Sequence, residues 1–274
     1  MKFNENMASL HAYLSGDGYV IRNPPEQKHK YYRIDLRNFN SVLLKDFQNK
    51  FYKEFGVKPK ICADGRCRKK SKEIYLYLTK EYSYYSYEWE IPKFKNKTYL
   101  SSWIRSFYDC EGWVINKERQ SRCVNIESVN FNGLKQLKKY LLIFNIKTAK
   151  IKSRKQGKIF RLEIFGKENL IRFQNKINFI HPEKKTYLEK AINSYVNYFW
   201  TIPKNKKALL KFIKKIGIIR KERKHMRINS IKKKNLAVIK IRLMNFKIKS
   251  KLGGPYISGS YSKYYTLTMT SSQS

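Results

Sequence analysis

The sequence predicts an α+β fold in which a unit of helix, two strands, helix, two strands and helix occurs twice, followed by a basic C-terminal extension. Three observations predict it: a helix ending that recurs at a fixed spacing, the same order of helical and strand periodicities after each copy, and positive charge spread over the whole chain. We expect the first repeat to span residues 1–92, the second residues 93–200, and the extension residues 201–274.

The recurring feature is an apolar helix face that ends in a carboxylate followed by glycine. The apolar positions i, i+3 and i+4 and the acidic position i+7 are Leu10, Tyr13, Leu14 and Asp17 in the first copy and Ile104, Phe107, Tyr108 and Glu111 in the second. The second set follows the first at a constant offset, since 111 − 17 and 104 − 10 are both 94. Residues at these spacings share one face of a helix, and a glycine after the acid is typical of a helix end.

A carboxylate at the C-terminus of a helix is electrostatically unfavourable, because the helix dipole is negative there. A single acidic helix end is usually a solvated cap, but two copies with the same unfavourable placement indicate a function. If the apolar faces of the two helices pack together, both carboxylates meet at one end of the interface, where they repel unless a cation lies between them. This arrangement suits Mg²⁺, which binds one or two protein carboxylates together with waters and phosphate oxygens.

At residues 14–18 (Leu-Ser-Gly-Asp-Gly) and 107–112 (Phe-Tyr-Asp-Cys-Glu-Gly) the chain resembles the LAGLIDADG homing endonucleases in their single-chain, two-repeat form. The resemblance covers roughly residues 8–180. It implies two pseudo-symmetric αββαββα repeats with saddle-shaped antiparallel sheets. It also implies an intron-encoded monomer with an internal pseudo-twofold axis, and this monomer would cut double-stranded DNA at a specific site. Ser15 and Cys110 depart from the small residues usual in the family motif, and Asp109 is an additional acid that we expect to cap a helix or pair with an arginine.

The resemblance also implies a metal site. Asp17 and Glu111 would hold Mg²⁺ near the scissile phosphates of the two strands, with the backbone carbonyls of Gly16 and Cys110 as further ligands. Such an ion polarises the phosphoryl oxygen, activates water and stabilises the leaving 3′ oxygen.

Further candidates are assigned from their positions on strands. Arg37 and Lys117 are expected to order the attacking water, with phosphate contact or plain solvation as an equal alternative. The expected DNA-binding residues either contact base edges from the exposed face of a strand or bind phosphate through a basic side chain. They are Arg33, Asp35, Arg37, Lys69, Lys70, Lys152, Arg154 and Arg161.

The remaining elements are expected in the same order in both repeats. The first repeat should contain strands over 19–24 and 30–37, a helix over 41–55, and a hairpin of strands 57–63 and 71–79. The second should contain strands over 113–117 and 123–128, a helix over 132–144, a hairpin of strands 146–152 and 159–165, and a last helix from about residue 168. Residues 88–97 form the expected connection between the repeats.

The C-terminal extension repeats part of this pattern. Phe246-Lys247-Ile248-Lys249 matches Phe144-Asn145-Ile146-Lys147 at the end of the corresponding helix, and a hairpin is expected over 257–267. No acid occurs in residues 209–219, where an acidic helix end would fall. We expect a degenerate half-repeat or a winged helix-turn-helix, with a structural cap as the third possibility, and no catalytic acid in any of them.

The composition indicates a polyanionic partner, which we expect to be double-stranded DNA. The chain has 60 Lys and Arg against 20 Asp and Glu, a formal net charge of +40, with 42% hydrophobic residues. This apolar content excludes simple disorder, and a charge of this size favours nucleic acid. No run of 18 apolar residues, lipidation signal or signal peptide occurs, so we expect no membrane partner and a cytoplasmic (prokaryotic) or organellar protein that is not secreted. The four cysteines fit no zinc spacing and are expected to be free thiols.

Two other functions remain open. An RNA maturase of the same family, assisting the splicing of an intron RNA, would keep the fold and the basic face without the metal chemistry. A non-catalytic DNA-binding regulator would tolerate the loss of either acid. Retention of both Asp17 and Glu111 argues against a pure maturase and against the regulator, but not against a dual role.

Overall fold

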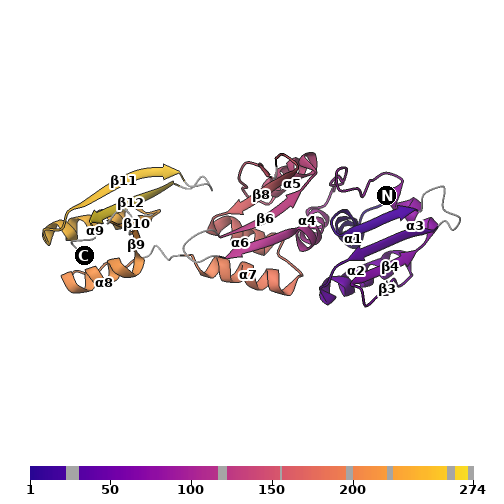
Figure 1. Ribbon diagram of the computed structural model, residues 1–274, viewed down its shortest axis with the longest axis horizontal. Helices are drawn as coiled ribbons and strands as arrows, with labels where there is room; N and C mark the ends of the chain where they lie inside the picture. The colour runs from indigo at the N-terminus through magenta and orange to yellow at the C-terminus, as the bar shows by residue number, and fades with distance from the viewer. Residues whose placement is uncertain are drawn as a thin grey trace. The chain divides into compact units, whose positions relative to one another are not determined.

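A computed structural model of the chain describes residues 1–22, 31–116, 122–154, 156–195, 200–220, 225–257 and 263–270. The chain divides into two compact units, Met1–Ser194 and Tyr195–Ser274 (Figure 1). None of the described helices is long and apolar enough to cross a membrane. The four cysteines carry free thiols, as expected.

The N-terminal unit contains both expected repeats, each with the predicted order of elements. The first half consists of α1 (Glu5–Ser15), β1 (Gly18–Arg22), β2 (Tyr32–Arg37), α2 (Ser41–Phe55), β3 (Lys60–Ile61), β4 (Arg66–Lys70) and α3 (Lys72–Thr79). The second half consists of α4 (Lys97–Glu111), β5 (Gly112–Asn116), β6 (Arg122–Ser128), α5 (Phe131–Ile143), β7 (Lys152–Arg154), β8 (Ile159–Phe165) and α6 (Lys167–Lys176), followed by α7 (Pro182–Asn193). The predicted α+β class with duplicated αββαββα repeats is confirmed.

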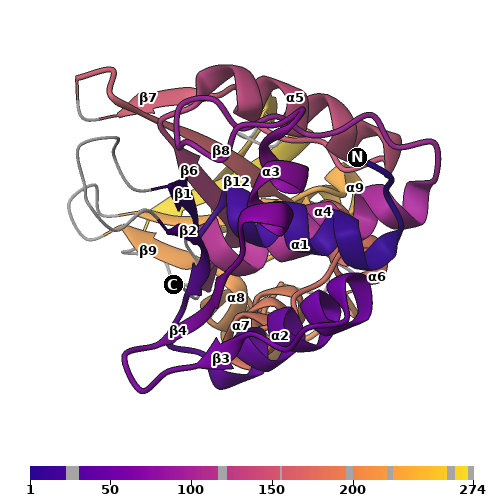
Figure 2. The ribbon, with the colours of Figure 1, turned by 90° about the vertical axis from the view of Figure 1, so that its right-hand side faces the viewer.

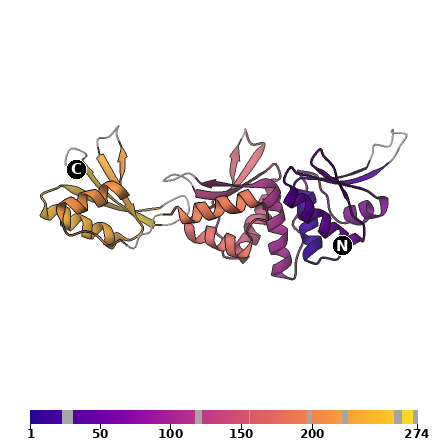
Figure 3. The ribbon, with the colours of Figure 1, turned by 90° about the horizontal axis from the view of Figure 1, so that it is seen from below.

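Each half builds one four-stranded antiparallel sheet of the same topology. The strand orders are β1-β2-β4-β3 and β5-β6-β8-β7, so the first, second, fourth and third strands of each half are neighbours. In Figure 3 the strands of this unit lie on one side and its helices on the other. Side chains alternate between the two faces of a strand, so one face of each sheet covers the helices and the other is free for polar groups.

Helices α1 and α4 pack against each other at the centre of the N-terminal unit (Figure 2). Gly16 at the end of α1 faces Cys110, because a Cβ added to Gly16 would lie 2.7 Å from the Cβ of Cys110. Residues at intervals of four share a helix face, so the facing residues are small on both helices. We call this set the small-residue ladder; it consists of Ala8, Ala12 and Gly16 on α1 and Ser102, Ser106 and Cys110 on α4. Only small side chains allow two helix backbones to approach this closely.

The helix pair is reinforced by a buried polar contact. The indole Nε1 of Trp103 donates a hydrogen bond to Nδ1 of His11 across the interface, at 3.0 Å. Burial lowers the pKa of His11 to about 3, so this imidazole stays neutral and can accept at Nδ1. Nearly all of α1, residues Met7 to Ser15, is buried, because α4 covers one side of it and the core of its own repeat covers the other.

Two expectations about the helices are wrong. Residues 71–79, expected as the second strand of a hairpin, form α3, and the strand of the hairpin is β4. Ser71 caps α3 by accepting a hydrogen bond from the backbone N–H of Ile74, and Ile74 and Leu78 are buried at helical spacing while Leu76 is half exposed. The second error is the omission of α7, which follows α6 and begins at Pro182.

In its described residues, the C-terminal unit has the element order of either half of the N-terminal unit without the last helix. We call this unit and each half of the N-terminal unit a half-repeat. It consists of α8 (Lys206–Ile216), β9 (Ile218–Arg220), β10 (His225–Ser230), α9 (Lys233–Asn245), β11 (Ser250–Ile257) and β12 (Lys263–Thr270). Its sheet has the order β11-β12-β10-β9, which again makes the first, second, fourth and third strands neighbours. The element order, up to the last strand, and the strand order of this unit are therefore those of each half of the N-terminal unit.

The junction that recurs in the sequence has one conformation in all three half-repeats. Gly56, Asn145 and Lys247, which follow the second helix of each half-repeat, adopt φ angles of 66°, 57° and 58°. These angles lie in the left-handed region that reverses the chain at a helix C-terminus. The pattern Phe-x-Ile/Val-Lys, at residues 55–58, 144–147 and 246–249, is thus the signature of a helix end, and its third copy marks a third copy of the fold.

The small-residue ladder should not tolerate a larger side chain. Ala12 is fully buried, so Ala12→Leu has to separate α1 from α4 or force strained rotamers, and we expect it to destabilise the N-terminal unit by about 1–3 kcal/mol. Urea unfolding followed by tryptophan fluorescence would measure this. Ala208→Leu on the exposed side of α8 is the control and should change stability by less than about 0.5 kcal/mol. Equal stability of the two variants would show that the helices are not closely packed at Ala12.

Candidate functional site

Each acidic helix end is followed by a glycine because the chain turns back closely against its own helix. A Cβ on Gly18 would lie 2.3 Å from the carbonyl oxygen of Leu14, and one on Gly112 would lie 2.7 Å from that of Tyr108. Both distances are too short for any side chain. The acid that precedes each glycine is therefore held at the point where helix passes into strand, which fixes its position in both halves.

The packing of α1 against α4 brings these two helix ends together. Gly16 lies against Cys110, and Asp17 and Glu111 follow these residues directly. The carboxylate of Asp17 accepts a hydrogen bond from the side-chain amide of Asn38 at 2.8 Å. The backbone N–H of Arg37 donates to the carbonyl of Asp17 at 3.0 Å, which attaches the end of β2 to the same place.

The two carboxylates share a partly buried, negatively charged environment. Burial and, to a lesser extent, the negative charge of Asp17 raise the pKa of Glu111 to about 7, although the charge of Lys184 opposes both effects. Burial likewise raises the pKa of Asp17, against hydrogen bonds from Asn38 and Cys110 and the charge of Lys184. The folded chain thus disfavours the ionised form of both acids, and a cation at this point would relieve that cost.

Lys184 is a residue of this site that the sequence reasoning missed. Its ammonium group, carried by α7, donates to the backbone carbonyls of Tyr108, Asp109 and Cys110 at 3.3, 2.5 and 3.3 Å. It therefore caps the negative end of the α4 dipole and contributes positive charge near both acids. The carbonyl of Cys110, expected from the family resemblance to ligate a metal, accepts one of these hydrogen bonds.

Asp109 positions the helix that carries Lys184. Its carboxylate accepts the backbone N–H groups of Ile180 and His181 at 3.0 to 3.1 Å, immediately before α7 begins at Pro182. Burial raises the pKa of Asp109 to about 6, partly offset by these hydrogen bonds. Asp109 therefore attaches the segment that leads into α7 to the end of α4. The available signal for α7 in the sequence was Pro182 followed by Glu183, which is typical of a helix start.

The donor set fits a hard divalent cation. Asp17 and Glu111 supply carboxylate oxygens, and the helix ends around them supply backbone carbonyls. Among the described residues no group of three or more His, Cys, Asp and Glu side chains is arranged to enclose a metal ion. A closed zinc-type site is thus not formed there, whereas Mg²⁺ binds through one or two carboxylates and completes its shell with water and phosphate.

The polar face of the first sheet carries charged side chains that are paired with one another. Asp35 is fully buried and contacts Nε of Arg33 at 3.0 Å and Nε of Arg68 at 3.1 Å. In this geometry Asp35 orients two guanidinium groups and does not present its carboxylate to solvent. Lys70 pairs in register with Arg33 and shares its face, whereas Lys69 pairs with Ile34 and lies on the opposite, helix-covered face.

The second sheet has a corresponding network. Arg161 contacts Glu127 at 2.7 Å, and its guanidinium lies over the ring of Trp113 at 5.0 Å. Lys152 forms an ion pair with Glu163, and Arg154 approaches Glu127 at 3.4 Å. Lys152 and Arg154 are about half exposed and lie on the same face as Arg161, so the structure brings these three predicted DNA-binding residues together.

The two candidates for water ordering have different outcomes. The side chain of Arg37 is exposed at the end of β2, and its backbone contacts Asp17. Lys117 lies outside the described residues. The roles assigned to both residues stay predictions.

Comparison with known proteins agrees with this fold. Residues 98–178, in the second repeat, match the family model of the LAGLIDADG-like domain, in agreement with the resemblance predicted from the sequence motifs. The homing endonuclease I-DmoI in complex with DNA and Ca is 20% identical over 68% of this chain and 99% of that chain, with a TM-score of 0.50. The homing endonuclease I-WcaI bound to its DNA recognition sequence is 15% identical over 69% of this chain and 88% of that chain, with a TM-score of 0.44.

A third similar structure is the full-length DUF199/WhiA from Thermatoga maritima, at 13% identity over 78% of this chain and 68% of that chain, with a TM-score of 0.46. At 20% identity the likeness to I-DmoI concerns the fold alone. No curated protein sequence matches the chain.

The raised pKa of Glu111 predicts a pH-dependent stability. The folded-state value of about 7 lies above the ordinary value of 4.5, so the folded chain binds this proton more tightly and stability is lost as pH rises from about 4.5 to 7. Glu111→Gln removes that loss. In metal-free buffer we expect the variant to be more stable than the parent by roughly 1–3 kcal/mol at pH 8 and equally stable at pH 4. Urea unfolding at both pH values, with EDTA present, measures the difference in the free energy of unfolding between variant and parent. An equal difference at pH 4 and pH 8 would contradict this prediction.

Removal of the Lys184 ammonium should destabilise the helix ends. Lys184→Met removes the ammonium donor from the carbonyls of Tyr108, Asp109 and Cys110 and the positive charge near the acids, so we expect a loss of about 1–3 kcal/mol at pH 8. The neighbouring Lys185 is exposed, and Lys185→Met is the matched control, with little expected change. Thermal unfolding without metal distinguishes the two variants. Comparable melting temperatures would mean that Lys184 does not hold these carbonyls in solution.

Proposed function

We propose that the N-terminal unit is a divalent-metal-dependent endonuclease that cuts both strands of double-stranded DNA at a specific site. The observation that carries this proposal is the meeting of Asp17 and Glu111, one from each pseudo-symmetric half, at the ends of two closely packed helices. A pseudo-symmetric pair of acids matches the pseudo-symmetry of duplex DNA, in which the two scissile phosphates belong to antiparallel strands.

Asp17 and Glu111 are the proposed ligands of Mg²⁺, together with the carbonyls of Gly16 and Cys110. The Cys110 carbonyl accepts a hydrogen bond from Lys184 and would bind the cation through its second lone pair. A bound divalent cation supplies charge stabilisation at the phosphoryl oxygens and a more acidic water molecule. The side chains of the chain itself set the geometry: Asn38 holds one oxygen of Asp17, and Lys184 holds the end of α4. Arg37, whose backbone contacts Asp17, is the proposed group for orienting water.

The sheets are the proposed DNA-binding surfaces. Their polar faces present Arg33, Lys70, Lys152, Arg154 and Arg161, and the internal ion pairs with Asp35, Glu127 and Glu163 hold several of these side chains in place. A guanidinium group that is already oriented loses less side-chain entropy when it binds a base edge or a phosphate. The formal charge of +40 adds the non-specific attraction that brings DNA to these surfaces.

The carboxylates should be needed for cleavage and not for binding. We expect Asp17→Asn and Glu111→Gln each to lower double-strand cleavage by at least about 100-fold, because the charge that holds the cation is lost, while Kd for the target changes by less than about threefold. Glu189→Gln, at an exposed position of α7, is the control and should cut like the parent.

The target would first be found by incubating the chain with a random-insert plasmid library and Mg²⁺, followed by sequencing of the new ends. Cleavage of the selected site by either acid variant at the parental rate would exclude these acids as metal ligands. Cleavage that persists in EDTA would exclude a metal-dependent mechanism.

A further inference from the structure

We propose that the third half-repeat uses the outer face of α8 to bind the phosphate backbone of duplex DNA, in place of the helix pairing that α1 and α4 perform. The proposal rests on the proposed function for the identity of the ligand as DNA. It starts from Gly217, which follows α8 as Gly18 follows α1 and Gly112 follows α4. A Cβ on Gly217 would lie 2.7 Å from the carbonyl oxygen of Ile213, so the same close turn fixes the correspondence between the three helices.

This correspondence places lysines at the positions of the small-residue ladder. Counting back from Gly217, Lys215, Lys211 and Lys207 occupy the positions of Gly16, Ala12 and Ala8 in α1 and of Cys110, Ser106 and Ser102 in α4. Lys214 occupies the position of Ser15 and Asp109. The position of the catalytic acids is occupied by Ile216, which packs against the apolar core of the unit. The helix has therefore lost both the pairing surface and the acid, while keeping the glycine and the core.

The four lysines form one continuous surface, which we call the α8 lysine face: Lys207, Lys211, Lys214 and Lys215. All four are exposed, and at 3.6 residues per turn they lie within about 100° of one another on the helix. Leu209 and Ile213, on the other side of α8, are fully buried. The face extends about 12 Å along the helix axis, a length over which one strand of duplex DNA presents three to four phosphates at about 3.4 Å each.

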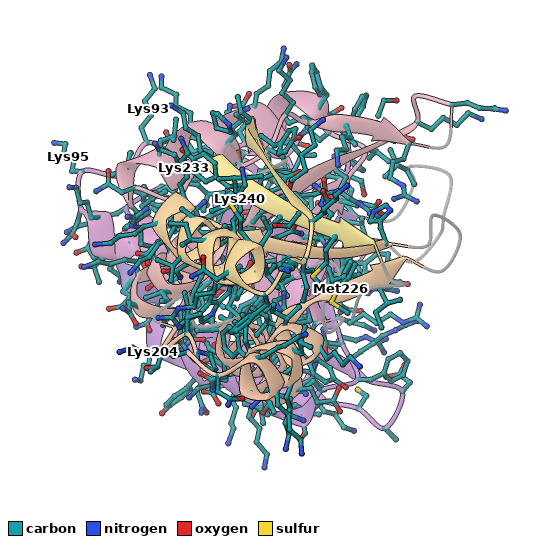
Figure 4. All side chains as sticks on the ribbon, turned by 90° about the vertical axis from the view of Figure 1, so that its left-hand side faces the viewer. Lys93, Lys95, Lys204, Met226, Lys233 and Lys240 are labelled. Atoms are coloured by element: carbon teal, nitrogen blue, oxygen red, sulfur yellow. The ribbon has the colours of Figure 1, made fainter. Side chains whose placement is uncertain are left out.

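A role limited to solubility would not favour this arrangement. Lysines at spacings of four repel one another, and Lys206 and Lys207 stand in the first turn, where the helix dipole is also positive. A solvated face gains from interspersed acids, yet α8 has none, and residues 195–274 contain 20 Lys and Arg against a single acid, Glu222. Lys204, which Figure 4 labels just before α8, adds one more exposed cation next to this face.

The sheet of this unit is a weaker candidate for the same role. The described residues on its polar face include Asn229, Thr266 and Thr268, together with the cations Arg227, which donates to Asn229, and Lys251, which pairs in register with Thr268. In the two repeats of the N-terminal unit the corresponding faces carry networks of Arg, Lys, Asp and Glu. Helix α8 carries five of the 20 Lys and Arg of residues 195–274, more than any other helix or strand of the unit.

The test compares two variants of the full chain with equal loss of charge. In one, all four residues of the α8 lysine face are changed to glutamine, which has a similar helix propensity. In the control, Lys233, Lys234, Lys240 and Lys249, which are exposed on and after α9, are changed in the same way. Binding to a fluorescein-labelled 30-base-pair duplex without a target site is measured by anisotropy in EDTA over a range of salt concentrations.

We expect the α8 variant to bind the duplex at least about tenfold more weakly at 0.1 M salt. Each lost phosphate contact changes the slope of log K against log salt by roughly 0.9, so this slope should become shallower by about 2 to 4. The control should change the slope by less than about 1. Replacement of the four α8 lysines by arginine should preserve both affinity and slope. Circular dichroism and urea unfolding verify that each variant is folded.

Equal losses in the two glutamine variants, or an unchanged α8 variant, would overturn the proposal. So would a loss that appears only with a 30-base-pair RNA duplex, because the ligand would then be RNA. Because the assay contains EDTA, its result does not depend on metal-dependent cleavage. If DNA binding depends on α8 but the chain cuts no site with any divalent metal, the proposed function is refuted and this inference remains valid.

Discussion

The close contact between α1 and α4 is the interaction on which the rest of the N-terminal unit depends. The small-residue ladder lets the two backbones approach, and this approach places Gly16 against Cys110. Larger side chains at these positions would separate the helix ends and, with them, Asp17 and Glu111. The same contact relates the two sheets, because each is attached to its helix by a glycine that permits no side chain. Close packing therefore determines both the pseudo-symmetry of the unit and the concentration of negative charge at one point in it.

That concentration has an energetic cost which the structure only partly offsets. The acids lie at the negative ends of two helix dipoles and are largely removed from water, so burial raises the pKa of both Asp17 and Glu111. The charge of Lys184 offsets part of this cost for both acids, and the hydrogen bond from Asn38 offsets part of it for Asp17. The remaining cost is the part that a divalent cation can remove. Cation binding and folding stability are consequently linked, since anything that binds only the folded state stabilises it.

The sequence predicted those parts of the fold that depend on local pattern, and it missed those that depend on contacts between distant residues. The acidic helix ends, α2 and the order of elements follow from periodicity and glycine positions, and all were predicted. The strand expected over 71–79 is a helix because Ser71 caps its first turn and Ile74 and Leu78, four residues apart, are both buried on one helix face. Lys184 could not be found by pattern, since it reaches the carbonyls of α4 from a helix more than 70 residues later.

The third half-repeat shows how few positions separate a pairing helix from a surface helix. Its core, its strand order, the turn at Gly217 and the left-handed residue at Lys247 are those of the other two half-repeats. Two features differ: lysines occupy the ladder positions, and Ile216 occupies the position of Asp17 and Glu111. Neither change disturbs the fold, because the lysines at the ladder positions are exposed and Ile216 packs against the apolar core of the unit. A helix with an exposed lysine at each ladder position cannot pack closely against a like-charged copy of itself, so the substitutions that expose α8 also prevent it from pairing. The fold can therefore be repeated without creating a second pair of acidic helix ends, and the extra copy is left with a charged face whose natural complement is a phosphate backbone.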